Sequence, residues 1–275
     1  MDTLNVIHSI ISSASTISAM ERCFAPTQRE LGSFFDDKKI SIHLPTLNEE
    51  RWVGDTLESL VSQQLYKDIR ERNKLKLNII VLDSSSTDRT IEVAKKYVGE
   101  KNIWTAPKGK ISARDFGVRK DDADIIVSVD ADTVYPQGWL SAILRPFEDP
   151  DVVMVHGPKL SRPLGGIIHR STRVCFILLK QSRAVQEIFH HASATNSAFR
   201  RDIYLLNPFR LDIDQMDRNV LWVEEEFFWP YKMEKFGNVV YLPDTAVLSS
   251  DRHRLFSGDP HSDEYERARK KGIRF

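Results

Sequence analysis

A chain of 275 residues that is 41% hydrophobic can bury one large core or two small ones, which excludes disorder as its main state. Lysine plus arginine equal aspartate plus glutamate at 39 each, and this zero formal net charge gives no indication of a nucleic-acid partner. The two cysteines, Cys23 and Cys175, are too few for a disulfide framework, so we expect a soluble cytoplasmic protein.

Residues 1–38 are rich in serine and carry apolar residues at helical spacing from Ile7 to Ile17, which predicts an N-terminal helical extension. A docking helix is favoured over a membrane-surface anchor, because the polar face lacks lysine and arginine. The apolar run Val174–Leu179 is far shorter than the roughly 20 residues that cross a bilayer. No basic region precedes the first apolar positions, which disfavours a secretory signal. We expect no transmembrane segment, and peripheral membrane contact stays open.

From position 40 the chain alternates between strand and helix patterns. Three strands are predicted, each followed at once by a loop: Ile40–Leu44, Ile79–Leu82 and Ile125–Val129. Helical spacing predicts two helices between them, with these inner faces: Val53, Leu57, Leu60 and Val61, and Ile91, Ala94 and Val98. A cap at Ser86 or Thr87 is expected for the second helix. The β-α-β-α-β order implies a mostly parallel sheet with right-handed crossovers.

Polar residues follow these strands closely: Thr46, Asp83, Asp130 and Asp132. Because parallel strands end at one edge of a sheet, we expect these side chains to line one crevice. The Asp130/Asp132 pair suggests a divalent metal that holds a phosphate-bearing substrate. The D-x-D pattern occurs four times and only this pair follows an apolar strand, so a helix cap or a turn stays open for the pair alone. The glycine-rich loops of dehydrogenases and P-loop NTPases are absent from the sequence.

Five blocks of the sequence are informative through their order and spacing: Leu44–Glu50, Val81–Asp88, Lys110–Gly117, Asp130/Asp132, and Glu225–Glu226 with Gly237 and Pro243–Asp244 behind it. Together they resemble the inverting family-2 glycosyltransferases with the GT-A fold. The resemblance implies an α/β fold with a Rossmann-like, mostly parallel central sheet flanked by helices. It also implies one domain at 39–250, with a nucleotide-sugar and metal half at 39–157 and an acceptor half at 158–250. Residues 251–275 would form a basic C-terminal tail.

The resemblance assigns binding of the nucleotide sugar to a set of residues from both halves: Pro45, Thr46, Asn48, Glu49, Asp83, Arg114, Asp130 and Asn196. Asp83 would accept a hydrogen bond from the imide N–H of uracil, and Arg114 would help to offset the charge of the diphosphate. For Arg114, a surface position on its helix is the alternative. Asp132, with Asp130 beside it, would bind Mn²⁺ or Mg²⁺. Asn196 would contact the sugar, although Ala194 stands where the family usually has glycine.

Glu225 and Glu226 stand where the family carries a Glu-Asp pair, so the resemblance makes Glu226 the catalytic base with Glu225 beside it. Which glutamate acts stays open, because the second residue is one methylene longer than aspartate. A solvated helix start is the alternative for this acidic cluster. Many relatives also carry a histidine near the position of Ser249. His253 fits either a basic loop over the diphosphate or a surface turn.

The implied function is that of a metal-dependent, inverting hexosyltransferase that uses a nucleotide-diphospho-sugar donor, with uridine or deoxythymidine expected and guanosine as the main alternative. The acceptor would be a glycan, a lipid-linked molecule or a small molecule. A sugar-nucleotide pyrophosphorylase is a rival, but it would need a glycine-rich loop where Leu44–Glu50 has no glycine. A nucleotide-sugar-binding module without turnover is the rival outside enzymology.

Overall fold

The computed structural model describes residues 35–63, 65–66, 76–161, 194–209 and 229–250 of the chain. The chain divides into two compact units, of which the larger comprises Arg22–Lys159 and His190–Val247. The smaller comprises Met1–Glu21, Leu160–Phe189 and Leu248–Phe275, and only its residues 160–161 and 248–250 are described. All strands of the central sheet belong to the larger unit.

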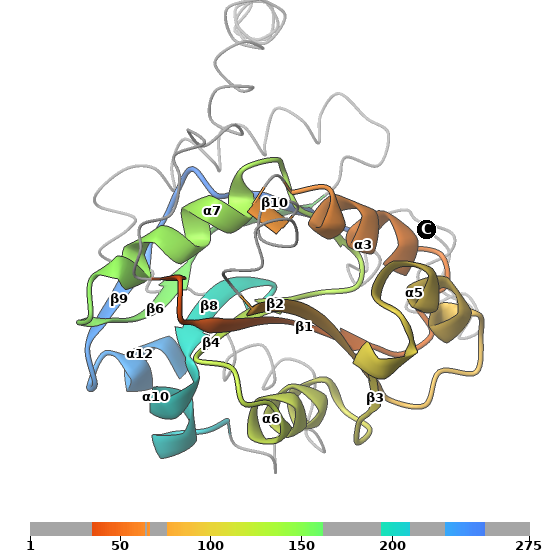
Figure 1. The fold of residues 1–275 in the computed structure, drawn as a ribbon, viewed down its shortest axis with the longest axis horizontal. Coiled ribbons are helices and arrows are strands. Elements are labelled where there is room, and N and C mark those ends of the chain that lie inside the picture. Colours follow the sequence, from red (N-terminus) through yellow and green to blue (C-terminus); the bar gives the residue numbers. More distant parts are fainter. Residues whose placement is uncertain (1–34, 64, 67–75, 162–193, 210–228, 251–275) are drawn as a thin grey trace, which may run out of the picture. The chain divides into compact units, whose positions relative to one another are not determined.

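The central sheet has seven strands in the order β3-β2-β1-β4-β8-β6-β9 (Figure 1). Their bounds are β1 Lys39–Thr46, β2 Lys76–Asp83, β3 Ile103–Thr105, β4 Ile125–Val129, β6 Val152–His156, β8 Asn196–Arg200 and β9 Asn238–Tyr241. Strand β8 runs antiparallel to β4 and β6, and the other four pairings are parallel. The prediction of an α/β fold with a mostly parallel sheet is therefore confirmed. Three short strands lie outside this sheet: β5 Thr133–Val134, β7 Lys159–Ser161 and β10 Val247–Ser249.

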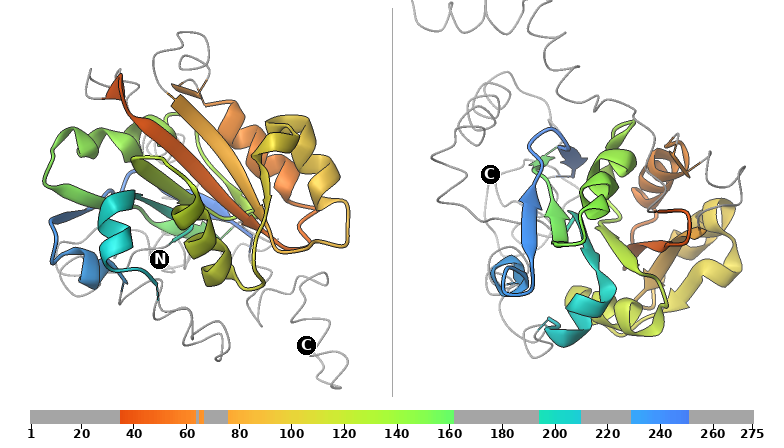
Figure 2. Two further views of the ribbon diagram at one scale, coloured as in Figure 1. Left: turned by 60° about the horizontal axis from the view of Figure 1, so that its bottom comes forward. Right: turned by 60° about the vertical axis from the view of Figure 1, so that its left-hand side comes forward.

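Helices cover both faces of the sheet, as Figure 1 and the two views of Figure 2 show. Helices α3 (Val53–Val61), α5 (Thr90–Val98) and α7 (Trp139–Leu144) lie on one face. Helices α6 (Lys110–Lys120), α10 (Arg201–Leu206) and α12 (Trp229–Met233) lie on the other. Two turns of 3₁₀ helix complete the described elements, η2 Glu100–Asn102 and η3 Arg145–Glu148.

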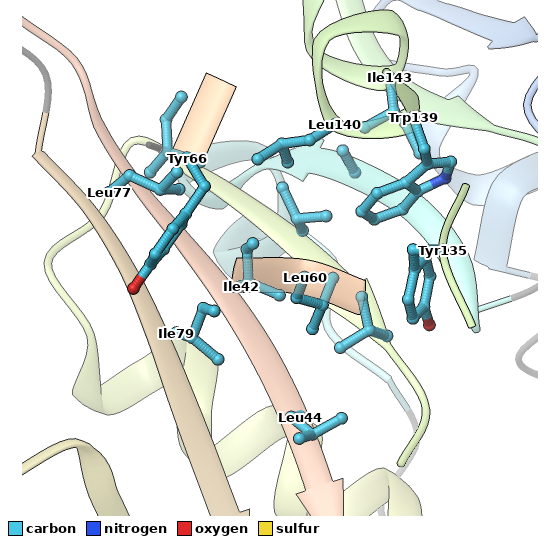
Figure 3. Packing of buried hydrophobic residues seen from close by; sticks show 14 of the residues in the cluster. Ile42, Leu44, Leu60, Tyr66, Leu77, Ile79, Tyr135, Trp139, Leu140 and Ile143 are labelled. Carbon is cyan, nitrogen blue, oxygen red and sulfur yellow. The ribbon is translucent and has the colours of Figure 1, made fainter. Parts of the chain in front are cut away.

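The alternation in β1 explains how the sheet is held between these layers. Ile40, Ile42 and Leu44 are fully buried and belong to the larger core cluster, together with Leu60 of α3 and Trp139 of α7. Figure 3 shows Ile42, Leu60 and Trp139 within this cluster. A second cluster forms between the sheet and the helices of the other face: Ile111, Val118, Ile126, Met154, Phe199, Tyr204 and Trp229. Burial on both faces explains why β4 and β6 read as nearly continuous apolar runs.

The predicted cap of the second helix is wrong. Helix α5 begins at Thr90, and the backbone N–H of Thr90 donates to the Asp88 carboxylate at 3.0 Å. Ser86 and Thr87 are unavailable as caps, because both take part in hydrogen bonds between two loops at the end of the sheet. Among the helices that the structure describes, none has the length and apolar character that a bilayer span requires.

Candidate active site at the carboxyl edge of the sheet

The carboxyl ends of β1, β2 and β4 lie next to one another, because the three strands run parallel. Thr46 at the end of β1 is in register with Asp83 at the end of β2, and Asp130 and Asp132 follow β4 directly. Pro45, partly buried, precedes Thr46 within β1. The structure thus brings together the four polar residues that the sequence assigned to one edge. This edge is where open α/β sheets bind their ligands.

Thr46 and Asp83 form one hydrogen-bonded unit. The hydroxyl of Thr46 donates to Oδ1 of Asp83 at 3.0 Å. The hydroxyl of Ser86 donates to the same oxygen at 2.6 Å, and the backbone N–H of Ser86 donates to Oδ2 at 3.0 Å. With Asp83 only 3% exposed, these bonds fix the orientation of its carboxylate.

The loop after β1 is tied to the loop after β2 through Asn48 and Glu49. Asn48 adopts a left-handed backbone with φ of 56°, and its side-chain oxygen accepts from the N–H of Thr87 at 2.9 Å. The backbone N–H groups of Asn48 and Glu49 donate to the hydroxyls of Ser86 and Thr90 at 2.9 and 2.7 Å. Asn48 is exposed and Glu49 is buried. Both residues therefore hold the loop in place, and their contact with a ligand stays a prediction.

Asp130 is bound on both carboxylate oxygens by neighbours from distant parts of the chain. Arg114 donates to Oδ1 at 2.5 Å, Thr195 donates to Oδ2 at 2.5 Å, and the Lys110 ammonium lies 3.4 Å from Oδ2. Burial by itself would raise the pKa of Asp130, but the charges of Lys110, Arg114 and Lys159 and the Thr195 hydrogen bond hold this pKa well below its usual range. The carboxylate of Asp130 is therefore ionised, with its charge matched inside the protein.

Arg114 is only 3% exposed, so the alternative of a surface arginine is wrong. Its Nε donates to the Ser128 hydroxyl at 3.2 Å, and its Nη2 donates to the carbonyl oxygens of Val129 and Ala194 at 3.2 and 3.4 Å. Together with the bond to Asp130, these contacts join α6 to the end of β4 and to the residues before β8. The positive charge of Arg114 thus lies at the predicted edge of the sheet, where it forms an ion pair with Asp130.

Four residues around Asp130 were not predicted from the sequence: Lys110, Tyr135, Lys159 and Thr195. The hydroxyl of Tyr135 accepts from the backbone N–H of Asp130 at 3.0 Å and donates to the carbonyl of Thr195 at 2.9 Å. Burial and the charge of Asp130 raise the pKa of Tyr135 well above its usual value, which keeps this hydroxyl protonated. Lys110 and Thr195 lie in family-like blocks, which was a usable signal. Tyr135 and Lys159 carried none.

Asn196 is fully buried at the start of β8. Its side-chain oxygen accepts from Nε1 of Trp139 at 2.8 Å, and its amide nitrogen donates to the carbonyls of Pro158 and Thr245 at 3.0 and 2.7 Å. Gly157 packs so closely that a Cβ there would lie 2.7 Å from the amide nitrogen of Asn196. Direct contact between Asn196 and a sugar would require these bonds to exchange, and that role stays a prediction.

Asp132 offers the carboxylate that suits a divalent cation. It is 5% exposed, and the Thr133 hydroxyl lies 3.3 Å from its Oδ1. The backbone before it is held by Thr56, whose hydroxyl donates to the carbonyl of Ala131 at 2.8 Å. Among the described residues, no three histidine, cysteine, aspartate or glutamate side chains gather as a metal site. A hard cation such as Mg²⁺ or Mn²⁺ fits Asp132 when oxygen atoms of a bound ligand complete its shell.

Three sequence-predicted residues lie outside the described residues: Glu225, Glu226 and His253. The described chain resumes at Trp229, whose side chain is fully buried against Phe199 and Phe209. The catalytic assignment of the two glutamates stays a prediction.

In a comparison with protein-family models, residues 41–205 match "Glycosyl transferase family 2". Among curated proteins, a glucosyl-3-phosphoglycerate synthase of Petrotoga mobilis is 31% identical over 151 residues, which are 47% of this chain and 44% of that protein. A dolichyl-phosphate hexose transferase of Haloferax volcanii is 26% identical over 62% of this chain and 68% of its own. The chain spans less than half the length of the first three relatives that it matches.

Two solved structures have the same fold. A mannosyltransferase of Pyrobaculum calidifontis in complex with GDP-Man and Mn²⁺ has a TM-score of 0.58 at 19% identity, over 92% of this chain and 70% of that chain. The glucosyl-3-phosphoglycerate synthase of Mycobacterium tuberculosis, in complex with Mn²⁺, UDP and glucosyl-3-phosphoglycerate, has a TM-score of 0.56 at 18% identity, over 82% of this chain and 78% of that chain. The predicted GT-A fold is confirmed.

Proposed function

The chain belongs to glycosyl transferase family 2, and on that premise we propose that it moves a hexose from a nucleotide-diphosphate donor to an acceptor hydroxyl, with inversion at the anomeric carbon and with a divalent metal. The observation that carries the proposal is the meeting of Asp83, Asp130 and Asp132 at the carboxyl edge of a parallel sheet. Each of the three carboxylates has a different set of neighbours, which suits a different task.

Asp83 is proposed to accept the imide N–H of the donor base, with Thr46 hydrogen-bonded beside it. The orientation of its carboxylate is fixed by Thr46 and Ser86 before any ligand arrives. Such preorganisation favours binding, because less freedom is lost when the ligand arrives. The GDP-Man and UDP held by the two similar structures support a nucleoside diphosphate at this edge.

Asp132 is proposed to hold Mg²⁺ or Mn²⁺, with the donor diphosphate completing the shell. A metal ion bound there would supply charge neutralisation for the departing nucleoside diphosphate. Lys110, with 45% of its side chain exposed, carries a further positive charge at this edge. Asp130, matched by Arg114 and Thr195, is proposed to keep the end of β4 in place while its carboxylate borders the ribose and the metal shell.

Glu226 is proposed as the base that removes the proton of the acceptor hydroxyl, with Glu225 orienting the acceptor or the base itself. A hydroxyl is a poor nucleophile until a positioned base takes its proton. Support comes from the family membership and from the motif spacing back from Gly237, which packs against the backbone of Asp151 in the described part of the chain.

The acceptor is proposed to be a glycan, a lipid-linked molecule or a small molecule, and the cytoplasm is proposed as the location. The relatives named above act on acceptors of more than one kind, and family membership leaves this choice open. Residues 39–250 are proposed as the catalytic domain, preceded by a docking helix within 1–38 and followed by a basic tail at 251–275.

The test is a screen of nucleotide sugars by thermal stabilisation, followed by a transfer assay with the donors that bind. A bound donor raises the melting temperature by mass action, and the rise should need Mn²⁺ or Mg²⁺. Release of nucleoside diphosphate with formation of a glycosylated product would support the proposal. Binding without any turnover across a broad acceptor panel would support the binding module instead.

A further inference from the structure

The hydrogen bonds to the Asp83 carboxylate occupy most of its acceptor positions. A carboxylate offers about four lone-pair directions, two on each oxygen. Among the described residues, Oδ1 accepts from the hydroxyls of Thr46 and Ser86, at 3.0 and 2.6 Å, and Oδ2 accepts from the backbone N–H of Ser86 at 3.0 Å. Oδ1 is therefore saturated, and Oδ2 keeps one acceptor position.

The direction of the Ser86 hydroxyl is set by its own surroundings. Its oxygen accepts the backbone N–H of Asn48 at 2.9 Å, so its proton is directed to Asp83. Asn48 is held in turn by the N–H of Thr87, which bonds its side-chain oxygen at 2.9 Å. The hydrogen bonds between the two loops therefore fix the Ser86 hydroxyl in the orientation that saturates Oδ1.

We propose that Thr46 and Ser86 determine the base specificity of the donor site, because they leave Asp83 able to accept one hydrogen bond, through Oδ2, from the single imide N–H of uracil or thymine. Guanine presents two donors on one edge, N1–H and the 2-amino group, and would pair with both oxygens of a carboxylate. At this Asp83 one of those donors would be left unsatisfied in a buried position, which is costly. Cytosine has no imide N–H, and its N3 lone pair would face the carboxylate.

This inference rests on the proposed function, since it assumes that Asp83 meets the donor base. Its test is calorimetric titration of the full chain with UDP, GDP and CDP in the presence of Mn²⁺. The wild-type protein should bind UDP about tenfold more tightly than GDP, the factor that one uncompensated hydrogen bond accounts for. Ser86→Ala removes one donor from Oδ1, so the GDP-to-UDP ratio of dissociation constants should fall to near one.

The matched control is Ser84→Ala, the same change two residues earlier. The Ser84 hydroxyl donates to the carbonyl of Pro107 at 2.8 Å rather than to the Asp83 carboxylate, so the ratio should not change. Thr46→Val removes the other donor to Oδ1 at nearly constant shape and should lower the ratio as Ser86→Ala does. This second variant decides the matter should Ser86→Ala fail to fold.

The outcomes separate the inference from the function that underlies it. Tighter binding of GDP than of UDP by the wild-type protein, or a ratio that neither variant changes, would overturn the inference while leaving the glycosyltransferase proposal intact. Binding of none of the three nucleotides would instead overturn the proposed function at this edge.

Discussion

Replacing Asp130 by asparagine removes one negative charge from a buried cluster and leaves its shape almost unchanged. The Arg114 guanidinium, only 3% exposed, then loses the partner that it contacts at 2.5 Å. Breaking a buried ion pair from one side costs about 3–5 kcal/mol, because an uncompensated charge stays behind. The asparagine oxygen can still accept one hydrogen bond and Lys110 is half exposed, so we expect a value near the lower end, about 3 kcal/mol.

The assay is urea unfolding followed by two probes, in which the midpoint should fall while the slope stays constant. Asp122→Asn is the matched control, since Asp122 pairs with Lys39 at the surface with 79% of its side chain exposed. Exposed pairs contribute little, so this control should change stability by less than about 1 kcal/mol. Similar small losses for Asp130→Asn and Asp122→Asn would refute the reasoning from burial.

The pH dependence gives an independent check on the same variant. The pKa of Asp130 is held well below its usual range in the folded protein, so its contribution is present above the unfolded pKa of about 3.9 and is lost as the pH falls toward the folded pKa. The difference in stability between the wild-type protein and Asp130→Asn should be constant from about pH 5 to 8 and shrink below about pH 4. A difference that grows on acidification would contradict the assignment of the charge.

Further variants test the site and the packing beneath it. Asp132→Ala should abolish transfer with an unchanged circular dichroism spectrum, and excess chelator should do the same to the wild-type protein; full transfer in chelator would exclude a metal requirement. Glu226→Gln should keep donor binding and lower transfer by about 10²- to 10⁴-fold, with a smaller loss for Glu225→Gln; the reverse order would make Glu225 the base. Gly117→Ala should destabilise by about 1–3 kcal/mol, because the new methyl would lie 2.6 Å from a buried side chain of β2. Gly54→Ala, whose methyl would meet nothing closer than 3.4 Å, should stabilise by about 0.5–1 kcal/mol, and equal signs for the two glycines would contradict the packing.

The strand ends could be predicted because their signal is local. The run Ile125–Val129 is apolar except for Ser128 and is followed at once by Asp130, and the structure shows β4 with these bounds. The alternation from Ile40 to Leu44 predicted β1 for the same reason, because successive side chains of a strand point to opposite faces and the pattern lies within one segment. Parallel pairing then follows from the order of strands and helices, which needs no distant information.

The neighbours of Asp130 could not be predicted in the same way, because distant segments bring them. Thr195 lies 65 residues away in sequence and reaches Asp130 only because β8 enters the sheet antiparallel to β4. That reversal has no counterpart in the β-α-β pattern from which the sheet was predicted. Tyr135 is near in sequence, yet its hydroxyl is fixed by the carbonyl of Thr195, so its role depends on the same strand.

Loop residues were misread for a related reason. Ser86 and Thr87 precede a helix and have the side chains of typical caps, which favoured that interpretation. Their hydroxyl and backbone groups instead meet Asn48, in a loop 38 and 39 residues earlier. A cap is a local alternative to such bonds, and the tertiary contact prevailed because it fixes two loops at once.

The two aspartates after β4 illustrate why a short motif can combine two tasks. Two free carboxylates one residue apart would repel each other, and each would be harder to ionise. The protein removes this conflict by matching Asp130 with Arg114 and Thr195, so the end of β4 is ordered by the chain itself. Asp132, which is 5% exposed, is the residue proposed to hold the divalent cation. Asp130→Asn should therefore lower stability more than Asp132→Ala does, because the Asp130 carboxylate is bound to Arg114 and Thr195, whereas the proposed role of Asp132 is to hold the metal.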